Sequence, residues 1–160
     1  MKSWIEDLNA VVLHSYNTRL VGGFDEPFYQ APANGQPAEI RYTRDYERSA
    51  LHELAHWCVA GDQRRRLDDY GYWYAPDGRD TQQQQVFFRV EIRPQAIEKH
   101  FCSALGLAFD VSVDNLDNPD ISGLETFRQA VNEQYLQLSR KGLPSRAAAI
   151  TECLALHRTA

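Results

Sequence analysis

The spacing of apolar residues predicts a mostly helical chain. Near the amino terminus, Ile5, Leu8 and Val12 recur at helical intervals, which indicates a helix from Ser3 to about Tyr16. The same reasoning predicts further helices at about 45–61, 81–90, 94–105, 124–141 and 145–156. The helix at 94–105 is expected to start at Pro94, because proline suits a first helical turn.

Short apolar segments between the first two helices predict a small sheet. Strands are expected at 18–21, 28–31 and 39–43, and one more at 109–113. Since no repeat or linker is found, residues 1–160 are expected to form a single domain of the α+β class, mostly helical, with the small sheet beside the helix at 45–61. Turn-forming residues separate the strands: Gly22-Gly23, Pro27, Pro32, Asn34-Gly35 and Pro37.

The composition is that of an ordinary globular protein. Of the 160 residues, 43% are apolar and 24% charged, and the formal charge of −5 argues against broad nucleic-acid binding. Cys58, Cys102 and Cys153 form no C-x-x-C pair, which indicates buried free thiols in a reducing compartment. No signal-peptide core and no apolar run of membrane-spanning length is found, so a cytoplasmic location without membrane attachment is expected.

The segment at 52–56 carries the clearest chemistry, because it reads His-Glu-x-x-His within a predicted helix. Residues four apart on a helix are about 40° apart around its axis, so His52 and His56 project from one stripe and can bind one metal ion. Glu53 stands beside that stripe and is the candidate catalytic residue. The stripe borders the core positions Leu51 and Ala55, where the floor of a cleft is expected.

Two histidines need a third protein ligand to hold a catalytic metal. In one extended peptidase pattern, a histidine follows six residues after the second motif histidine. Here that position is Asp62, and Val59 replaces the glycine that makes the required turn. Asp62 is therefore a weak candidate.

Glu91, Glu98 and His100 are the other candidates for the third ligand. We favour Glu91, because it stands between the apolar residues Val90 and Ile92. Burying an unpaired carboxylate there would be costly, and a metal ion would remove that cost.

Two imidazoles and one carboxylate permit two chemistries. Zinc would keep one position for a water, with Glu53 as general base, which gives hydrolysis. Iron(II) would keep three positions for dioxygen, water and a substrate atom, which gives oxygenation. A zinc peptidase is expected to offer an exposed edge strand, for which 39–43 is the candidate. A non-catalytic metal-binding module is expected to add a fourth protein ligand such as His100 or Asp62.

Several stretches of the chain resemble the bacterial elongation factor P hydroxylase family. Three of them, which begin within residues 49–94, are Leu-His-Glu-Leu-Ala-His-Trp-Cys-Val-Ala-Gly, Asp-Tyr-Gly-Tyr-Trp-Tyr-Ala-Pro-Asp-Gly-Arg-Asp and Val-Glu-Ile-Arg-Pro-Gln-Ala. Asn-Thr-Arg-Leu at 17–20, Asp-Glu-Pro at 25–27 and Val-Asp-Asn-Leu at 113–116 extend the resemblance over nearly the whole chain. It is weakest in the last helix, and the chain ends soon after Leu156, earlier than the family pattern.

The resemblance implies a single catalytic domain that hydroxylates a lysine of elongation factor P after a β-lysyl group has been attached to it. It implies a metal, most simply iron(II), held by His52, His56 and Glu91 on a scaffold like that of zinc peptidases, with dioxygen as oxidant. Whether a further co-substrate is needed stays open. In such an oxygenase, Glu53 would hold a water on the metal or receive its proton. The resemblance ranks the hydroxylase above the peptidase, which is otherwise the commoner use of the motif.

A modified lysine arm that carries ammonium groups would need apolar walls and nearby carboxylates. The candidate walls are Tyr72, Trp73 and Tyr74, and the candidate carboxylates are Asp25, Glu26, Asp77 and Asp80. Each also fits a plainer role as a core aromatic, a turn residue or a surface charge. The basic clusters Arg41, Arg44, Arg48 and Arg64 to Arg66 are candidates for steering an acidic protein partner.

Overall fold

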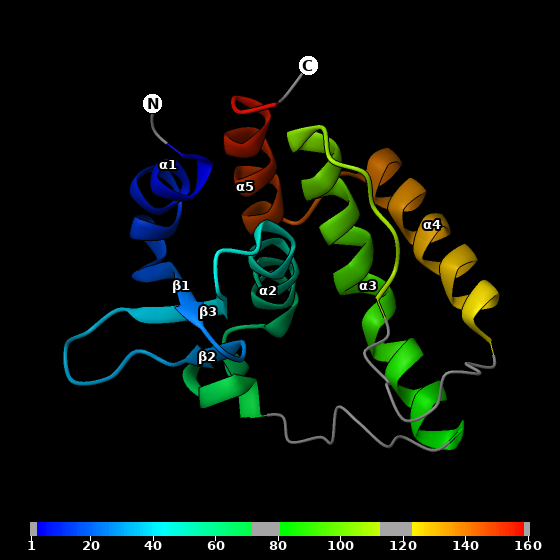
Figure 1. Cartoon of the computed structure of the whole chain (residues 1–160), viewed down its shortest axis with the longest axis horizontal. Helices are drawn as coiled ribbons and strands as arrows, with labels where there is room; N and C mark the ends of the chain where they lie inside the picture. Colours follow the sequence, from blue (N-terminus) through cyan, green and yellow to red (C-terminus); the bar gives the residue numbers. More distant parts are fainter. Residues whose placement is uncertain (1–2, 72–80, 113–122, 159–160) are drawn as a thin grey trace.

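The computed structural model describes residues 3–71, 81–112 and 123–158 and shows a mostly helical chain with one small sheet (Figure 1). The strands are β1 (Thr18–Phe24), β2 (Phe28–Gln30) and β3 (Ala38–Thr43). The helices are α1 (Trp4–Val11), α2 (Glu47–Ala60), α3 (Thr81–Leu105), α4 (Leu124–Lys141) and α5 (Ser145–Ala155), with short 3-10 helices η1 (Leu13–Tyr16), η2 (Arg64–Arg66) and η3 (Asp68–Gly71). The predicted class, α+β and mostly helical, is confirmed.

The three strands form a sheet in the order β1-β3-β2, with β1 parallel and β2 antiparallel to β3. Ala38, Ile40 and Tyr42 of β3 alternate toward the core. β3 is therefore the central strand, and the expectation that 39–43 forms an exposed edge was wrong, because β1 and β2 pair with its two sides.

β1 continues past the glycines that were expected to end it, with an irregular register between Val21 and Phe24. Gly22 allows this continuation, since a Cβ on it would lie 2.5 Å from the Tyr42 ring and 2.6 Å from the Arg44 carbonyl oxygen. Only glycine permits such a close approach of the two strands.

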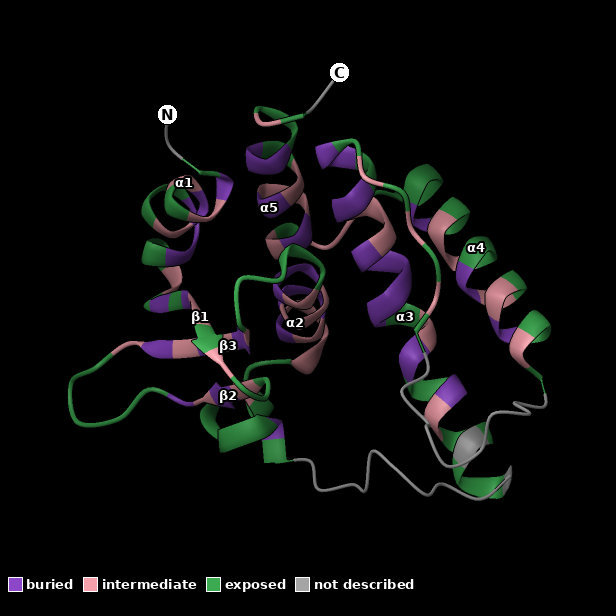
Figure 2. Cartoon of the chain, viewed as in Figure 1, coloured by how far each residue is buried: buried purple, intermediate pink, exposed green. Residues whose placement is uncertain are grey.

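α2 is the central helix and contacts β3 on one side and α3 and α5 on another. Leu51, Leu54, Ala55 and Trp57 of α2 are fully buried, and Figure 2 shows the buried residues of α2, α3 and α5 facing one another. The three cysteines are free, two of them buried and Cys58 partly so. No helix in the described ranges combines the length and apolar character needed to cross a membrane.

α3 is one helix of 25 residues with Pro94 inside it, so the prediction of two separate helices was wrong. Proline cannot donate to the carbonyl four residues earlier, here that of Val90. Val90 is 61% exposed, so this turn of α3 faces solvent. Packing of the fully buried Ile97 and Phe101 then favours continuing the helix beyond the proline.

The strand predicted at 109–113 is absent from its described residues, 109–112. The backbone N–H of Ser112 donates to the side-chain oxygen of Gln95, and the Ser112 carbonyl accepts from the Gln95 amide. A buried side chain thus takes the place of a neighbouring strand.

Candidate metal centre

α2 presents its two motif histidines one turn apart, as the spacing predicted. Their Nε2 atoms lie 3.2 Å apart, and the side chains are about a quarter exposed, 23% for His52 and 27% for His56. The neighbouring Leu51, Leu54 and Ala55 are fully buried and fix this face of the helix at the edge of the core.

α3 brings the carboxylate of Glu91 to the same place. Its Oε2 lies 2.9 Å from His56 Nε2 and its Oε1 lies 3.7 Å from His52 Nε2. Glu91 is 5% exposed, and the ligand atoms of the three residues all lie within 4.8 Å of one another. This donor set fits a divalent metal ion, because it supplies two imidazole nitrogens and an anionic oxygen from three side chains.

Glu98, an alternative ligand in the sequence, instead lies at the far nitrogen of His52. Its Oε1 is 2.7 Å from His52 Nδ1. A carboxylate only accepts, so Nδ1 carries the hydrogen and Nε2 is the nitrogen left for a metal. Sequence reasoning missed this role, although Glu91 and Glu98 are seven residues apart and so share one face of a helix.

Gln95 lies between Glu91 and Glu98 on the same face of α3, and we call these three residues the α3 stripe. Sequence reasoning also missed the role of Gln95. It is fully buried, and its Nε2 donates to Glu91 Oε1 over 3.0 Å. Its position four residues after Glu91 was the available signal, because that spacing places two side chains one above the other.

The imidazoles and carboxylates at the centre stabilise each other's charged forms. Burial opposes a charge on His52, but the hydrogen bond to Glu98 and the nearby carboxylates outweigh it and raise the pKa of His52 to about 10. Burial likewise opposes ionisation of Glu91, but His56, His52 and Gln95 lower its pKa to about 2. Without a metal, the centre therefore pairs protonated imidazole with carboxylate, and a metal ion can replace the proton.

Glu53 projects beside the three candidate ligands without belonging to their group. Burial raises the pKa of Glu53, and the opposing charges of His52 and His56 only partly offset this effect. Its carboxyl is therefore easier to protonate than an ordinary glutamate, which suits a group that takes up and releases a proton.

The other ligand candidates lie elsewhere. Asp62 is exposed and pairs with Arg65 at 3.0 Å and Arg146 at 3.6 Å. His100 stacks on the Tyr135 ring, with centroids 4.1 Å apart, and its Nε2 bonds to the Tyr135 carbonyl. The fourth ligand expected of a non-catalytic module is therefore not supplied by either residue.

Of the candidate substrate residues, Asp25 and Glu26 lie in the exposed connection between β1 and β2. Among the described residues, neither belongs to the group formed by His52, His56 and Glu91. The remaining candidates, Tyr72, Trp73, Tyr74, Asp77 and Asp80, lie outside the described residues.

The basic clusters divide between exposed and structural side chains. Arg65 donates to the carbonyls of Trp57 and Cys58 and so satisfies the end of α2. Arg41 bonds to Glu39 and Gln30 within the sheet. Arg44, Arg48, Arg64 and Arg66 are exposed, and Arg64 also donates to the Tyr70 carbonyl.

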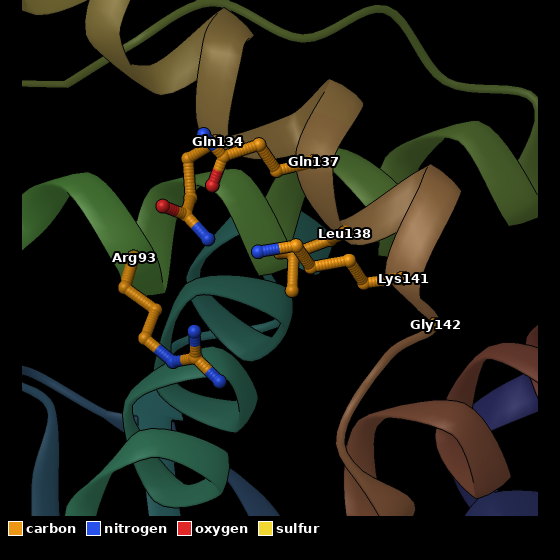
Figure 3. A pocket seen from close by; sticks show the side chains of 6 residues that line it. All are labelled: Arg93, Gln134, Gln137, Leu138, Lys141 and Gly142. Atoms are coloured by element: carbon orange, nitrogen blue, oxygen red, sulfur yellow. The ribbon is translucent and has the colours of Figure 1, made fainter.

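A separate groove of about 320 Å³ lies between α3 and the end of α4 (Figure 3). None of its lining residues is a candidate ligand: they are Arg93, Gln134, Gln137, Leu138, Lys141 and Gly142. The groove and the metal centre are thus different parts of the surface.

Comparison with known proteins identifies the family. The family model described as elongation factor P hydroxylase matches residues 8–159, a range that includes the final helix. A protein of Haemophilus influenzae named elongation factor P lysine hydroxylase is 44% identical over 160 aligned residues, which cover 96% of this chain and 89% of that protein. The chain therefore belongs to the elongation factor P hydroxylase family.

Proposed function

We propose that this protein hydroxylates the β-lysylated lysine side chain of elongation factor P, using dioxygen and a metal ion, iron(II), held by His52, His56 and Glu91. The observation that carries the proposal is the grouping of these three side chains, in a chain of this family, with ligand atoms within 4.8 Å. Iron(II) bound there would supply the activation of dioxygen. A cytoplasmic location and a single catalytic domain over residues 1–160 belong to the same proposal.

The protein's own groups have distinct tasks in this proposal. Glu98 holds the Nδ1 hydrogen of His52 and so directs Nε2 toward the metal position. Glu53, whose pKa burial raises, is the catalytic group that holds or moves a proton beside the reacting atoms. The ammonium groups of the substrate arm would be met by Asp25, Glu26, Asp77 and Asp80, and its apolar part by Tyr72, Trp73 and Tyr74.

The alternative is a zinc-dependent peptidase on the same His-Glu-x-x-His helix. Such an enzyme would bind an extended peptide along a sheet edge. The backbone N–H groups of Tyr29 in β2 and of Ala31 just after it already donate to carboxylates, to Asp69 over 3.1 Å and to Asp68 over 2.9 Å respectively. This arrangement favours the hydroxylase.

β1, the other outer strand, is also engaged. The Asn9 side chain accepts from the N–H of Leu20 and donates to its carbonyl. We therefore propose that α2 and the three candidate ligands resemble the metal site of a zinc peptidase. We do not extend the likeness to a sheet edge that binds a peptide.

The direct test uses purified protein, iron(II), air and β-lysylated elongation factor P. Intact-mass spectrometry of the partner should show a gain of one oxygen atom, which depends on oxygen and is prevented by a metal chelator. Unmodified elongation factor P serves as the control substrate and should gain less. Product formation that survives strict removal of oxygen would exclude an oxygenase.

Glu53→Gln separates the two candidate reactions. A zinc peptidase would lose its general base and nearly all activity. A hydroxylase should be weakened and keep measurable product formation, because no water has to be activated for attack. Complete loss of hydroxylation with the metal still bound would contradict the role assigned to Glu53.

A further inference from the structure

The amide of Gln95 connects the candidate ligand Glu91 to a backbone segment on the surface of α3. Gln95 Nε2 donates to Glu91 Oε1 over 3.0 Å and to the Ser112 carbonyl over 2.7 Å. Gln95 Oε1 accepts from the Ser112 N–H over 3.0 Å. The side chain is fully buried and is thus bonded at both its nitrogen and its oxygen.

The partners fix the orientation of this amide. Glu91 Oε1 and the Ser112 carbonyl both accept, so the NH₂ group must face them, and the Ser112 N–H requires the oxygen. An ionised glutamate at position 95 could not donate these bonds, and an apolar residue could make none of the three. The chemistry at this position is therefore specific to an amide.

Gln95 also selects between the two oxygens of Glu91. Oε1 is the oxygen held by Gln95, while Oε2 is the one 2.9 Å from His56 Nε2. A bound metal that engages Oε2 would fix the carboxylate plane, and through it the position of Oε1 and of the Gln95 amide.

The segment at the other end of this connection is also tied to α4. Asp110 pairs with Arg128 of α4 at 3.0 Å, and Phe109 and Val111 pack against the core. Residues 109–112 thus link α4 to the α3 stripe, with Gln95 as the contact nearest the metal centre.

We propose that Gln95 is a positioning residue that couples metal binding at Glu91 to the anchoring of residues 109–112. The proposal rests on the metal centre of the proposed function and extends it. By reciprocity, a metal that stabilises the anchored segment is itself bound more tightly when the segment is anchored.

The experiment uses Zn²⁺ alone as the probe, because it is diamagnetic and needs neither dioxygen nor elongation factor P. Hydrogen exchange of the Ser112 amide, measured by NMR, should slow at least about fivefold when Zn²⁺ binds the wild-type protein. The amide of Gly142, which donates to the Leu138 carbonyl at the end of α4, should exchange at the same rate with and without Zn²⁺. An unchanged Ser112 rate in the wild type would overturn the proposal.

Gln95→Met keeps the length and helical preference of the side chain and removes its three hydrogen bonds. Zn²⁺ affinity should fall about 10–100-fold, and Ser112 exchange at saturating Zn²⁺ should no longer respond to the metal. Gln137→Met on the exposed face of α4 is the matched control and should change neither quantity.

Unchanged Zn²⁺ affinity in Gln95→Met, or a Ser112 amide that still responds to Zn²⁺, would show that Gln95 only fills space. Should Gln95→Met fail to fold, the wild-type exchange comparison decides by itself. Since neither measurement involves hydroxylation, failure of the proposed activity and failure of this coupling are separate results.

Discussion

Two regions beside α2 bury polar groups in different ways. On α3, Glu91, Gln95 and Glu98 are buried at one-turn and two-turn spacings, and each has a hydrogen-bonding partner. In η3, Tyr70 is 5% exposed, yet its hydroxyl has no partner among the described residues. Burial, and then the charge of Glu53, raise the pKa of this hydroxyl well above its usual value.

The backbone of η3 is strained as well. Asp69 and Tyr70 have φ values of 50° and 60°, in the left-handed region that costs a non-glycine residue about 1–2 kcal/mol. The hydrogen bonds from Tyr29 in β2 to Asp69 and from Ala31 just after β2 to Asp68 hold this turn, and the Tyr29 ring stacks on Tyr70 with centroids 4.3 Å apart. The comparison teaches that helical spacing lines up the α3 groups so that α2 and residue 112 can satisfy them, whereas the turn keeps its shape at a local cost and leaves one buried hydroxyl without a partner among the described residues.

The largest expected effect concerns the ligands themselves. His52→Ala, His56→Ala and Glu91→Ala should each lower metal affinity by more than the roughly 10–100-fold typical of groups that only orient ligands, and should abolish hydroxylation. Metal content by mass spectrometry and product mass are the measurements. Glu133→Ala, an exposed glutamate on α4, is the control for a lost carboxylate. A Glu91→Ala protein that retains full metal content would remove α3 from the centre.

The second carboxylate of α3 should have a smaller effect. Glu98→Ala should weaken metal binding about 10–100-fold, and Glu98→Gln by less, because its oxygen can still accept from His52 Nδ1. Competition with a chelator measures both. If Glu98→Ala lost the metal as completely as Glu91→Ala, the distinction between ligand and orienting group would be wrong.

The pH dependence of stability comes next. The folded pKa of His52, about 10, lies above its ordinary value of 6.5, so its contribution to stability is fully present below pH 6.5 and is lost as the pH rises through 10. The metal-free protein should therefore unfold at a lower temperature at about pH 9.5 than at about pH 6.5. Zn²⁺ should stabilise more at the higher pH, because a smaller fraction of the protein then holds a proton that the ion has to displace.

Glu98→Gln should reduce the change of unfolding temperature with pH in the metal-free protein, because Glu98 contributes most to raising the pKa of His52. Thermal unfolding at the two pH values, with and without Zn²⁺, provides the comparison. A metal-free protein that becomes more stable from pH 6.5 to 9.5 would contradict the assigned direction.

The smallest expected effect tests the turn. Tyr70→Phe removes a buried hydroxyl without a partner and keeps the ring, so it should unfold no earlier than the wild type. Tyr29→Phe loses the bond from its hydroxyl to the Arg65 carbonyl and should cost about 1 kcal/mol, or about 2–4 °C. Equal destabilisation by the two variants would show that the Tyr70 hydroxyl is satisfied and would remove the contrast with α3.

Part of the metal centre was predictable from residues close together in the chain. His52 and His56 share a face because of helical spacing alone, and the helix predicted at 45–61 is observed at Glu47–Ala60. Glu91 was chosen for its apolar neighbours, and it is indeed buried, but Val90 is 61% exposed. The burial of Glu91 therefore comes from α2 packing against α3 rather than from the residues beside it.

Other features were not predictable because they depend on contacts between distant segments. Glu98 and His52 are 46 residues apart, and Gln95 and Ser112 are 17 apart. Whether a buried glutamate binds a metal or orients a ligand depends on the distance between two helices. Residue spacing within one helix does not contain that distance.

By itself, the sequence determined the mostly helical class, the three strands of the sheet and the pair of imidazoles, since these follow from local periodicity and side-chain chemistry. The tertiary structure decided that α3 runs on through Pro94, that β3 lies inside the sheet and that Glu91 rather than Glu98 completes the group of three. Packing makes these decisions because burial of apolar faces outweighs local preferences and sets which polar atoms meet.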